Sequence, residues 1–230
     1  MPAAVIRIAI LISGRGSNML RLVDSISPDL ACEIALVAAN APCAGLLAAD
    51  DRGLKTALID RSLYASKADH EADLAAAIEN AEADWIFLAG YMAVLSPAFV
   101  EKFSHHIINI HPSLLPHFKG LDTHSRALAV GALRHGATVH MVTAALDDGA
   151  VILQAGLDVG ENDDADQLAA RVLRLEHALY PFVLESLASG ALSVSGGLPV
   201  WHDGPTALMR CVREIQSVLA DSVIWPDQSM

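Results

Sequence analysis

Apolar and polar positions alternate regularly along the chain up to Ile110. Short apolar runs rich in valine and isoleucine end in Gly, Asn, Asp or Ser, a pattern typical of buried strands. These runs occupy residues 4–13, 32–40, 56–60, 85–90 and 106–110. The stretches between them are compatible with helices and occupy residues 17–25, 44–53, 66–82 and 97–103.

The alternation of strand and helix predicts crossover connections and therefore a mostly parallel sheet. The expected fold class is α/β, with a twisted, Rossmann-like sheet flanked by helices. Ligands of such folds bind at the carboxyl ends of the strands. We therefore expect the functional site just after the strands.

The pattern changes after Asn109. A helix is expected near residues 124–133, and strands at 138–143 and 151–159 are expected to form a C-terminal β-hairpin around Asp147, Asp148 and Gly149. A long amphipathic run at 164–187 predicts a helix packed on the sheet. A short strand is expected at 198–201 and a last helix at 206–219.

This pattern favours a single domain over residues 1–204. Its first half, about 1–105, is expected to bind phosphate, and its second half, about 106–204, is expected to contain the catalytic residues. Residues 205–230 form a tail to which the pattern assigns no role.

The amino-acid composition argues against several classes of protein, namely disordered, membrane-spanning and secreted proteins. Of 230 residues, 53% are hydrophobic and 18% charged, and the mean hydropathy of +0.40 excludes a disordered chain. The uncharged apolar stretch at residues 85–100 contains Gly90 and Pro97 and falls short of the ~20 apolar residues of a membrane-spanning helix. The apolar start is interrupted by Arg7, unlike a cleavable signal. We expect a cytoplasmic protein with no membrane partner.

Charge and cysteine content exclude further classes. Fifteen basic against 27 acidic residues give a net charge of −12, and without a basic tract nucleic acid is not an expected partner. Any bound phosphate would have to be held locally, by main-chain N–H groups and a few side chains. Cys32, Cys43 and Cys211 form no CxxC pair and are odd in number, so reduced thiols are expected.

A glycine-rich loop follows the first predicted strand and has the sequence Ser13-Gly14-Arg15-Gly16-Ser17-Asn18. Free N–H groups and a hydroxyl at such a turn suit a terminal phosphate. The loop is not a dinucleotide fingerprint, because Met19 occupies the third glycine position, and it lacks the Gly-Lys-Ser/Thr of a P-loop. The alternative is an ordinary glycine turn with Ser17 as helix cap.

A second candidate lies at the end of the predicted strand 106–110. Residues two apart in a strand project to the same face, so Asn109 and His111 can converge on one atom. An amide donor beside an imidazole suits acyl transfer, in which one group stabilises an oxyanion and the other manages a proton. The alternative is a structural histidine whose hydrogen bonds are satisfied in the core.

Asp147 is a third candidate, as a carboxylate that orients His111 and stabilises its imidazolium. The alternative is that Asp147 and Asp148 are only turn residues, and the sequence does not choose between the two interpretations.

The chain is also rich in histidine between His105 and His140. No metal is predicted there, because no recognised ligand spacing such as His-Glu-x-x-His occurs.

Taken together, these motifs resemble the folate-dependent phosphoribosylglycinamide formyltransferase family. The resemblance rests on Gly16-Ser17-Asn18, on Asn109 to Pro116 with Gly120, on the run from Leu146 to Gln154, on Arg171, and on Glu176 to Pro181. It covers about residues 6–201 in unbroken order. It implies formyl transfer from 10-formyltetrahydrofolate, as co-substrate, to the glycyl amine of glycinamide ribonucleotide in purine biosynthesis, with no metal, by a monomer or homodimer.

The resemblance also implies roles for individual residues. The catalytic set would be Asn109, His111 and Asp147, and the half of the domain that contains it, about 106–204, would also bind folate. The remaining residues would bind the two substrates. The phosphate of the nucleotide would be bound by Gly16, Ser17, Asn18, Met19 and Leu20, and the rest of the nucleotide by Pro112 and Glu176. The folate would be bound by Lys67, Met92, Ala93, Val94, Leu95, Thr143, Ala144, Ala145 and Leu146. Lys67 departs from the arginine that the family often has, and it lacks the planar fork of arginine.

Three alternatives remain open. Formyltetrahydrofolate hydrolase and methionyl-tRNA formyltransferase share the Asn, His, Asp arrangement, but the first is expected to have an N-terminal regulatory domain and the second a basic C-terminal domain. A non-catalytic nucleotide-binding module would bind a phosphate ligand without turnover. It would leave the Asn109, His111 and Asp147 arrangement without a purpose.

Overall fold

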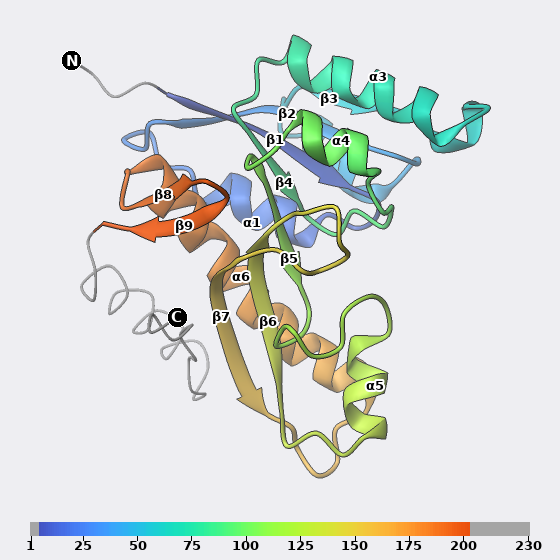
Figure 1. Ribbon diagram of the computed structural model, residues 1–230, viewed down its shortest axis with the longest axis vertical. Helices are drawn as coiled ribbons and strands as arrows, with labels where there is room; N and C mark the ends of the chain where they lie inside the picture. Colours follow the sequence, from blue (N-terminus) through green and yellow to red (C-terminus); the bar gives the residue numbers. More distant parts are fainter. Residues whose placement is uncertain (1–4, 203–230) are drawn as a thin grey trace. The chain divides into compact units, whose positions relative to one another are not determined.

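The computed structural model describes residues 5–202. Seven strands form one sheet in the order β3-β2-β1-β4-β5-β6-β7 (Figure 1). The chain divides into two compact units, residues 1–109 and 110–230. The tail at 205–230, with its predicted helix at 206–219 and Cys211, lies outside the described residues.

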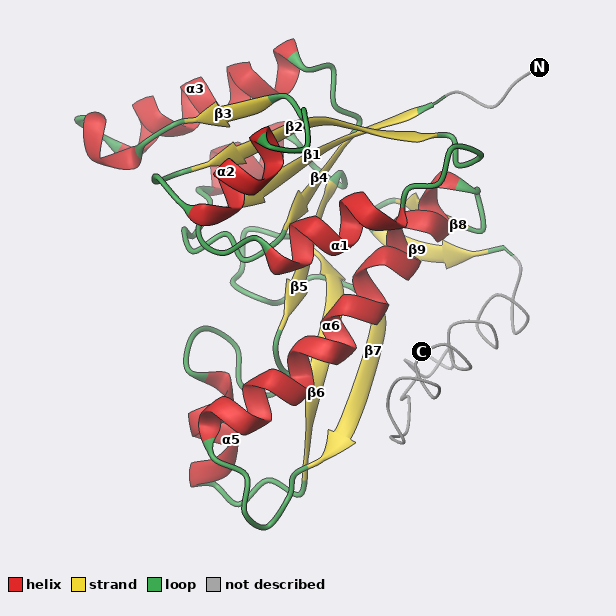
Figure 2. Ribbon diagram, turned by 180° about the vertical axis from the view of Figure 1, so that it is seen from behind, coloured by secondary structure: helices red, strands yellow, loops and turns green. Residues whose placement is uncertain are grey.

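The first unit has the alternating pattern that the sequence predicts. Its elements are β1 (Ile6–Ile12), α1 (Ser17–Ser25), β2 (Cys32–Ala39), α2 (Ala44–Asp50), β3 (Thr56–Leu58), the short 3₁₀ helix η1 (Arg61–Leu63), α3 (Lys67–Asn80), β4 (Trp85–Leu88), α4 (Pro97–Lys102) and the start of β5 (Ile107–His111). Neighbouring strands from β3 to β5 pair in parallel. Helices α1 and α2 cover one face of these strands, and α3 and α4 cover the other (Figures 1 and 2).

Strand β1 forms the centre of the first unit. Residues 8–12 are fully buried, because both faces of a parallel sheet are covered by helices. The strand pairs with β2 on one side and with β4 on the other. The chain leaves β1 toward β2 and β3 and later returns to the other side of β1 as β4, so the strand order reverses between β1 and β4. The loops that follow these two strands therefore lie at the same carboxyl edge of the sheet, where ligands of such sheets bind.

The second unit is built around an antiparallel pair. Its elements are α5 (Thr123–Ala129), β6 (Arg134–Met141), β7 (Val151–Asp158), α6 (Ala165–Ala188), β8 (Leu192–Ser195) and β9 (Leu198–Trp201). Strands β6 and β7 form the predicted hairpin, and α6 packs across both. Helix α6 begins at a capping box in which Asp164 accepts from the Gln167 N–H and the Gln167 side chain accepts from the Asp164 N–H.

Several element boundaries differ from the prediction. Strand β6 begins at Arg134 rather than at 138, because its polar first residues are held by pairing with β7, as in the Gly136–Gly156 pair. Strand β5 begins at Ile107, so His106 lies before it. Helix α5 ends at Ala129 rather than at 133, and β8 was not predicted. Within residues 5–202, no helix is long and apolar enough to cross a membrane.

Candidate functional site

The glycine loop between β1 and α1 presents main-chain groups rather than side chains. Gly16 is the N-cap of α1 in a left-handed conformation (φ 74°), and no side chain caps the helix. The expected alternative in which Ser17 is the cap is therefore wrong, because Ser17 is the first residue of the helix. The first-turn N–H groups, which have no partner within a helix, lie beside this loop.

Close packing explains why the loop needs glycine. A Cβ on Gly16 would lie 2.8 Å from the Cα of Gly45, the second residue of α2. The Gly45 N–H in turn donates to the Gly14 carbonyl at 3.0 Å. In contrast, a Cβ on Gly14 would meet no atom within 4 Å. Gly16 therefore serves the packing of the loop on α2, whereas Gly14 borders open space.

Ser13 joins the glycine loop to the segment after β4. Its hydroxyl donates to Asn40 Oδ1 at 2.7 Å and accepts from the Met92 N–H at 2.8 Å. Its main-chain N–H donates to the Gly90 carbonyl at 3.1 Å. Two segments for which the sequence predicts phosphate and folate binding are thus brought together in the first unit.

The predicted folate segment of the first unit exposes apolar side chains. Met92 is 70% exposed and Val94 is 63% exposed, whereas Leu95 is buried. Exposed side chains of this kind offer an apolar surface to a flat ring system. Nearby, burial and then the Glu71 charge raise the pKa of Tyr91 to about 12, so its phenol remains protonated.

A buried carboxylate supports the end of this segment. Glu71, on α3, accepts from the Ser96 N–H at 2.8 Å and from the Ser96 hydroxyl. Its Oε1 lies 3.7 Å from Nζ of Lys67, which is the first residue of α3. Ser96 also caps α4 by accepting from the Phe99 N–H. Glu71 therefore connects Lys67 with the loop that contains Met92. The sequence did not point to Glu71, because a single acid in an amphipathic helix gives no signal.

In the second unit, the structure brings His111 and Asp147 together. The Nδ1 atom of His111 lies 3.5 Å from Asp147 Oδ2, and the two side chains are only 7% and 8% exposed. Asp147 Oδ2 also accepts from the Gly120 N–H at 2.8 Å, and Asp147 adopts a left-handed conformation (φ 48°). A pure turn residue would point into solvent, so this burial favours a paired role for Asp147.

The other ring nitrogen of His111 fixes its tautomer. Nε2 lies 3.0 Å from the carbonyl oxygen of Phe118. A carbonyl can only accept, so Nε2 carries a proton and the exchangeable position is Nδ1. The separation of 3.5 Å from Asp147 is longer than an ordinary hydrogen bond. Asp147 therefore acts on the ring mainly through its charge and leaves Nδ1 able to contact a further group.

A second histidine adjoins Asp147. His140, on β6, places Nε2 3.8 Å from Asp147 Oδ1, and its Nδ1 donates to the Met141 carbonyl at 2.8 Å. Burial lowers the pKa of His140, so its ring is neutral near pH 7. The sequence offered His140 only as one of many histidines. Its place beside Asp147 depends on the pairing of β6 with β7.

Two further histidines pack near the pair. His135 Nε2 lies 3.2 Å from His124 Nδ1. Burial, and then the nearby His124, lowers the pKa of His135 to about 4, and burial lowers that of His124. Two neutral rings can share one hydrogen bond without repulsion. Among the described residues, no group of three or more His, Cys, Asp or Glu side chains is placed to hold a metal ion.

The remaining predicted residues occupy three places. Asn109 is in β5, two residues before His111 and therefore on the same face of the strand, and Pro112 directly follows β5. Residues 143–146 form an exposed segment before Asp147, in which Leu146 is 52% exposed. Glu176 is buried in α6.

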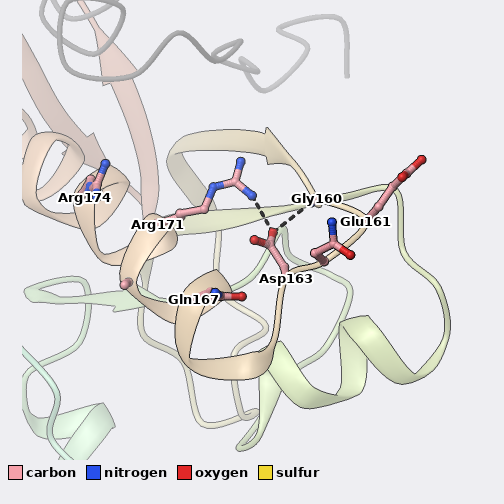
Figure 3. Close-up of a pocket in the computed structure, with 8 residues that line it drawn as sticks. Gly160, Glu161, Asp163, Gln167, Arg171 and Arg174 are labelled. Carbon is pink, nitrogen blue, oxygen red and sulfur yellow. Dashed lines mark hydrogen bonds and ion pairs between the residues drawn. The ribbon is translucent and has the colours of Figure 1, made fainter.

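An open hollow at the start of α6 contains none of the proposed catalytic residues. It is lined by Gly160, Glu161, Asn162, Asp163, Gln167, Ala170, Arg171 and Arg174 (Figure 3). The Arg171 guanidinium donates to Asp163 at 2.5 Å and to the Asp158 carbonyl at 2.9 Å. These contacts hold the connection between β7 and α6. Arg171, which contributed to the resemblance, therefore has a structural role here.

Comparison with known proteins gives consistent matches. A family model described as formyl transferase matches residues 6–184. Phosphoribosylglycinamide formyltransferase of Escherichia coli (strain K12) is 40% identical over 199 residues, which cover 86% of this chain and 93% of that protein. The trifunctional purine biosynthetic protein adenosine-3 of Homo sapiens is 39% identical over 190 residues, covering 82% of this chain; the matched part spans 19% of that longer protein.

A solved structure agrees with these matches. Glycinamide ribonucleotide transformylase 1 from Symbiobacterium toebii aligns with a TM-score of 0.81 at 36% identity. The alignment covers 86% of this chain and 94% of that chain.

Proposed function

Because the chain belongs to the formyl transferase family, we propose that it transfers the formyl group of 10-formyltetrahydrofolate to the glycyl amine of glycinamide ribonucleotide, a step of purine biosynthesis. The observation that carries this proposal is the buried His111–Asp147 pair, with Asn109 two residues before His111 on the same strand. The name of the E. coli relative, which the chain matches over most of both lengths, supports the choice of acceptor.

In this proposal, the neutral amine attacks the formyl carbon, and the formyl oxygen gains negative charge. The Asn109 amide and the protonated ring of His111 donate hydrogen bonds to that oxygen. Such donors stabilise charge most where water is excluded, and His111 is only 6% exposed. Asp147 offsets the positive charge of the ring from 3.5 Å.

The fixed tautomer of His111 determines which of its ring nitrogens can act on the substrate. The Phe118 carbonyl holds a proton on Nε2, so Nδ1 is the position that donates to the oxyanion. As the tetrahedral intermediate collapses, the C–N bond to the folate breaks, the attacking amine loses a proton and the folate nitrogen gains one. His111 Nδ1 or an ordered water relays this proton. The scheme needs neither a covalent enzyme intermediate nor a metal.

The glycine loop fits the phosphate of the nucleotide substrate. The main-chain N–H groups of residues 16–19 begin α1 without a side-chain cap, which suits a dianionic phosphate, whereas the Leu20 N–H already donates to the Gly16 carbonyl at 2.9 Å. The open space beside Gly14 leaves room for that phosphate. Pro112 and Glu176 are proposed to contact the rest of the nucleotide. Glu176 is a buried carboxylate that can accept hydrogen bonds from ribose hydroxyls.

The folate is proposed to bind at Met92, Ala93, Val94, Leu95, Thr143, Ala144, Ala145 and Leu146, with Lys67 near its glutamate. The exposed Met92, Val94 and Leu146 side chains fit the flat apolar rings, and the exposed Lys67 ammonium fits a carboxylate. Lysine offers a point charge rather than the two parallel donors of arginine, so the interaction of Lys67 with the folate carboxylate is expected to be less directional.

The decisive experiment is incubation of the purified protein with 10-formyltetrahydrofolate, with and without glycinamide ribonucleotide, while the folate product and the formylated nucleotide are both followed. Equal amounts of both products, formed only with the acceptor, support the proposal. Deformylation without the acceptor would instead identify a hydrolase, and nucleotide binding without turnover a non-catalytic module.

The proposed function also bears on the cellular compartment and the oligomeric state of the enzyme. We infer a cytoplasmic enzyme, which the free thiols of Cys32 and Cys43 support, because such thiols persist in a reducing compartment. The proposed state is a monomer or homodimer, which light scattering of the purified protein distinguishes.

A further inference from the structure

One short loop contacts both members of the His111–Asp147 pair through its main chain. This loop, residues 117–122, provides the Phe118 carbonyl that meets His111 Nε2 at 3.0 Å. It also provides the Gly120 N–H that donates to Asp147 Oδ2 at 2.8 Å. The position of the loop therefore sets the tautomer of His111 and the orientation of the Asp147 carboxylate together.

The backbone of this loop is unfavourable by itself. Phe118 and Asp122 adopt left-handed conformations (φ 56° and 57°), which are unfavourable for residues with side chains. Gly120, between them, has a φ of 80°. Such a conformation persists only where surrounding contacts hold it.

Arg126, on α5, makes contacts suited to that task. Its Nη1 atom donates to the Lys119 carbonyl at 2.6 Å and to the Leu121 carbonyl at 3.2 Å, the two carbonyls that flank Gly120. Its guanidinium also lies over the Phe118 ring, 5.8 Å from the ring centroid. One planar cation therefore contacts the loop on both sides of the Gly120 N–H and at the residue whose carbonyl meets His111.

Other contacts hold the loop at different points. The Ser113 hydroxyl donates to the His117 carbonyl at 2.7 Å, at the start of the loop. The Lys119 ammonium pairs with Asp148 through its side chain. Neither of these contacts involves the main-chain carbonyls beside Gly120.

We propose that Arg126 is a positioning residue, which holds the 117–122 loop so that its main chain fixes the His111 tautomer and the Asp147 carboxylate. The inference rests on the proposed function for its effect on turnover. Its effect on the ring of His111 is independent of any substrate. Arg126 itself touches no reacting atom in this scheme.

The test compares three variants with the wild-type protein. Arg126→Gln removes the cation, Arg126→Lys keeps the charge but removes the planar guanidinium that lies over the Phe118 ring, and Arg52→Gln is a control. Arg52 is an exposed arginine that also contacts a main-chain carbonyl, that of Ala48 at 3.4 Å. Long-range ¹H–¹⁵N spectra of the histidine rings, recorded where the rings are neutral, report the tautomer, and His111→Ala identifies the His111 signal.

Arg126→Gln is expected to replace the single Nε2-protonated form of His111 by a mixture of tautomers. It is also expected to lower kcat about 10-fold, while both KM values change less than about twofold, because misplaced catalytic groups slow the chemical step rather than binding. Arg126→Lys is expected to lie between the wild type and Arg126→Gln, and Arg52→Gln to match the wild type.

An unchanged His111 signal together with an unchanged kcat in Arg126→Gln would overturn the inference. If Arg126→Gln fails to fold, as judged by circular dichroism, the same comparison is made with Arg126→Lys, and wild-type values there overturn the inference equally. Should the wild type lack formyl transfer, the proposed function fails, yet the tautomer comparison still decides the role of Arg126.

Discussion

The glycine loop of the first unit and the His111–Asp147 pair of the second are built in opposite ways. The loop offers main-chain N–H groups at an uncapped helix start and open space beside Gly14. The pair consists of side chains that are less than a tenth exposed and are held by main-chain atoms of a strained loop. The difference suits the two tasks. A phosphate must enter and leave, whereas a proton-transferring group must stay fixed and shielded from water.

The same contrast appears in what each region tolerates. In the glycine loop, side-chain volume is the constraint, because Gly16 packs against the backbone of Gly45. Around His111, the constraint is the orientation of hydrogen bonds from Phe118 and Gly120. Changes in the first region should therefore affect substrate KM or folding, and changes in the second should affect kcat.

The largest effect is expected from the catalytic pair. His111→Ala, Asn109→Ala and Asp147→Asn should each lower kcat by ~10²-fold or more, because each removes a donor or a charge at the reacting carbonyl. Steady-state kinetics measure the loss, and circular dichroism checks that the fold survives. His106→Ala is the control, since this exposed ring lies outside β5 and contacts the Ser104 carbonyl and the Trp85 ring. Turnover near wild type in all three variants would refute the assignment.

Substitution of Gly14 and Gly16 distinguishes phosphate binding beside the loop from packing of the loop on α2. Gly14→Ala places a Cβ in open space and should raise the KM for glycinamide ribonucleotide about 10-fold by obstructing the phosphate, with little change in Tm. Gly16→Ala should lower Tm, because it adds a Cβ at 2.8 Å from the Gly45 Cα at a φ of 74°. The measurements are substrate titration and thermal unfolding. If Gly14→Ala leaves this KM unchanged, the loop is structural.

Glu71 provides a smaller test in the first unit. Glu71→Ala leaves the Ser96 N–H without its partner, and an unpaired buried donor costs about 1–3 kcal/mol. The KM for 10-formyltetrahydrofolate should rise several-fold as the 92–95 segment and Lys67 separate, with the nucleotide KM unchanged. Glu79→Ala, an exposed glutamate on the same helix, is the matched control. Equal changes in both KM values would show that Glu71 only supports the fold.

The smallest effect concerns the pH dependence of folding. Burial, and then the nearby His124, lowers the pKa of His135 in the folded protein to about 4, below the ordinary histidine value of about 6.5. Between these values the unfolded chain binds a proton that the folded chain does not, so the free energy of unfolding falls as the pH drops from about 6.5 to 4. One such group contributes a slope of up to ~1.4 kcal/mol per pH unit.

Urea unfolding of the wild type and of His135→Phe measures this slope. The phenylalanine variant removes the titrating ring and should unfold with a shallower pH dependence over this range. An identical slope in both proteins would mean that His135 is not the group responsible. His117→Phe, at an exposed position, serves as the control for the substitution itself.

Most of the architecture could be predicted from residue pattern alone. Apolar runs that end in turn residues mark buried parallel strands whatever their neighbours, so β1 to β5 were predicted within a few residues. The placement of Asn109 and His111 on one face of β5 followed from strand geometry in the same way. The polar start of β6 could not be predicted, because Arg134 and Gly136 are held in a strand by β7 rather than by local preference.

What the sequence determined by itself is therefore local: the strand and helix order, the glycine loop at a strand end, and the type of chemistry that an amide and an imidazole two residues apart can perform. Only the tertiary structure decided that Asp147, although it lies in a turn, is a partner of His111, that Gly16 rather than Ser17 is the N-cap of α1, and that Arg126 contacts the loop beside both residues. The reason is physical. Local pattern reflects φ/ψ preference and burial within a few residues, whereas the pairing of side chains 36 positions apart, as for His111 and Asp147, depends on contacts that form only when the whole unit is packed.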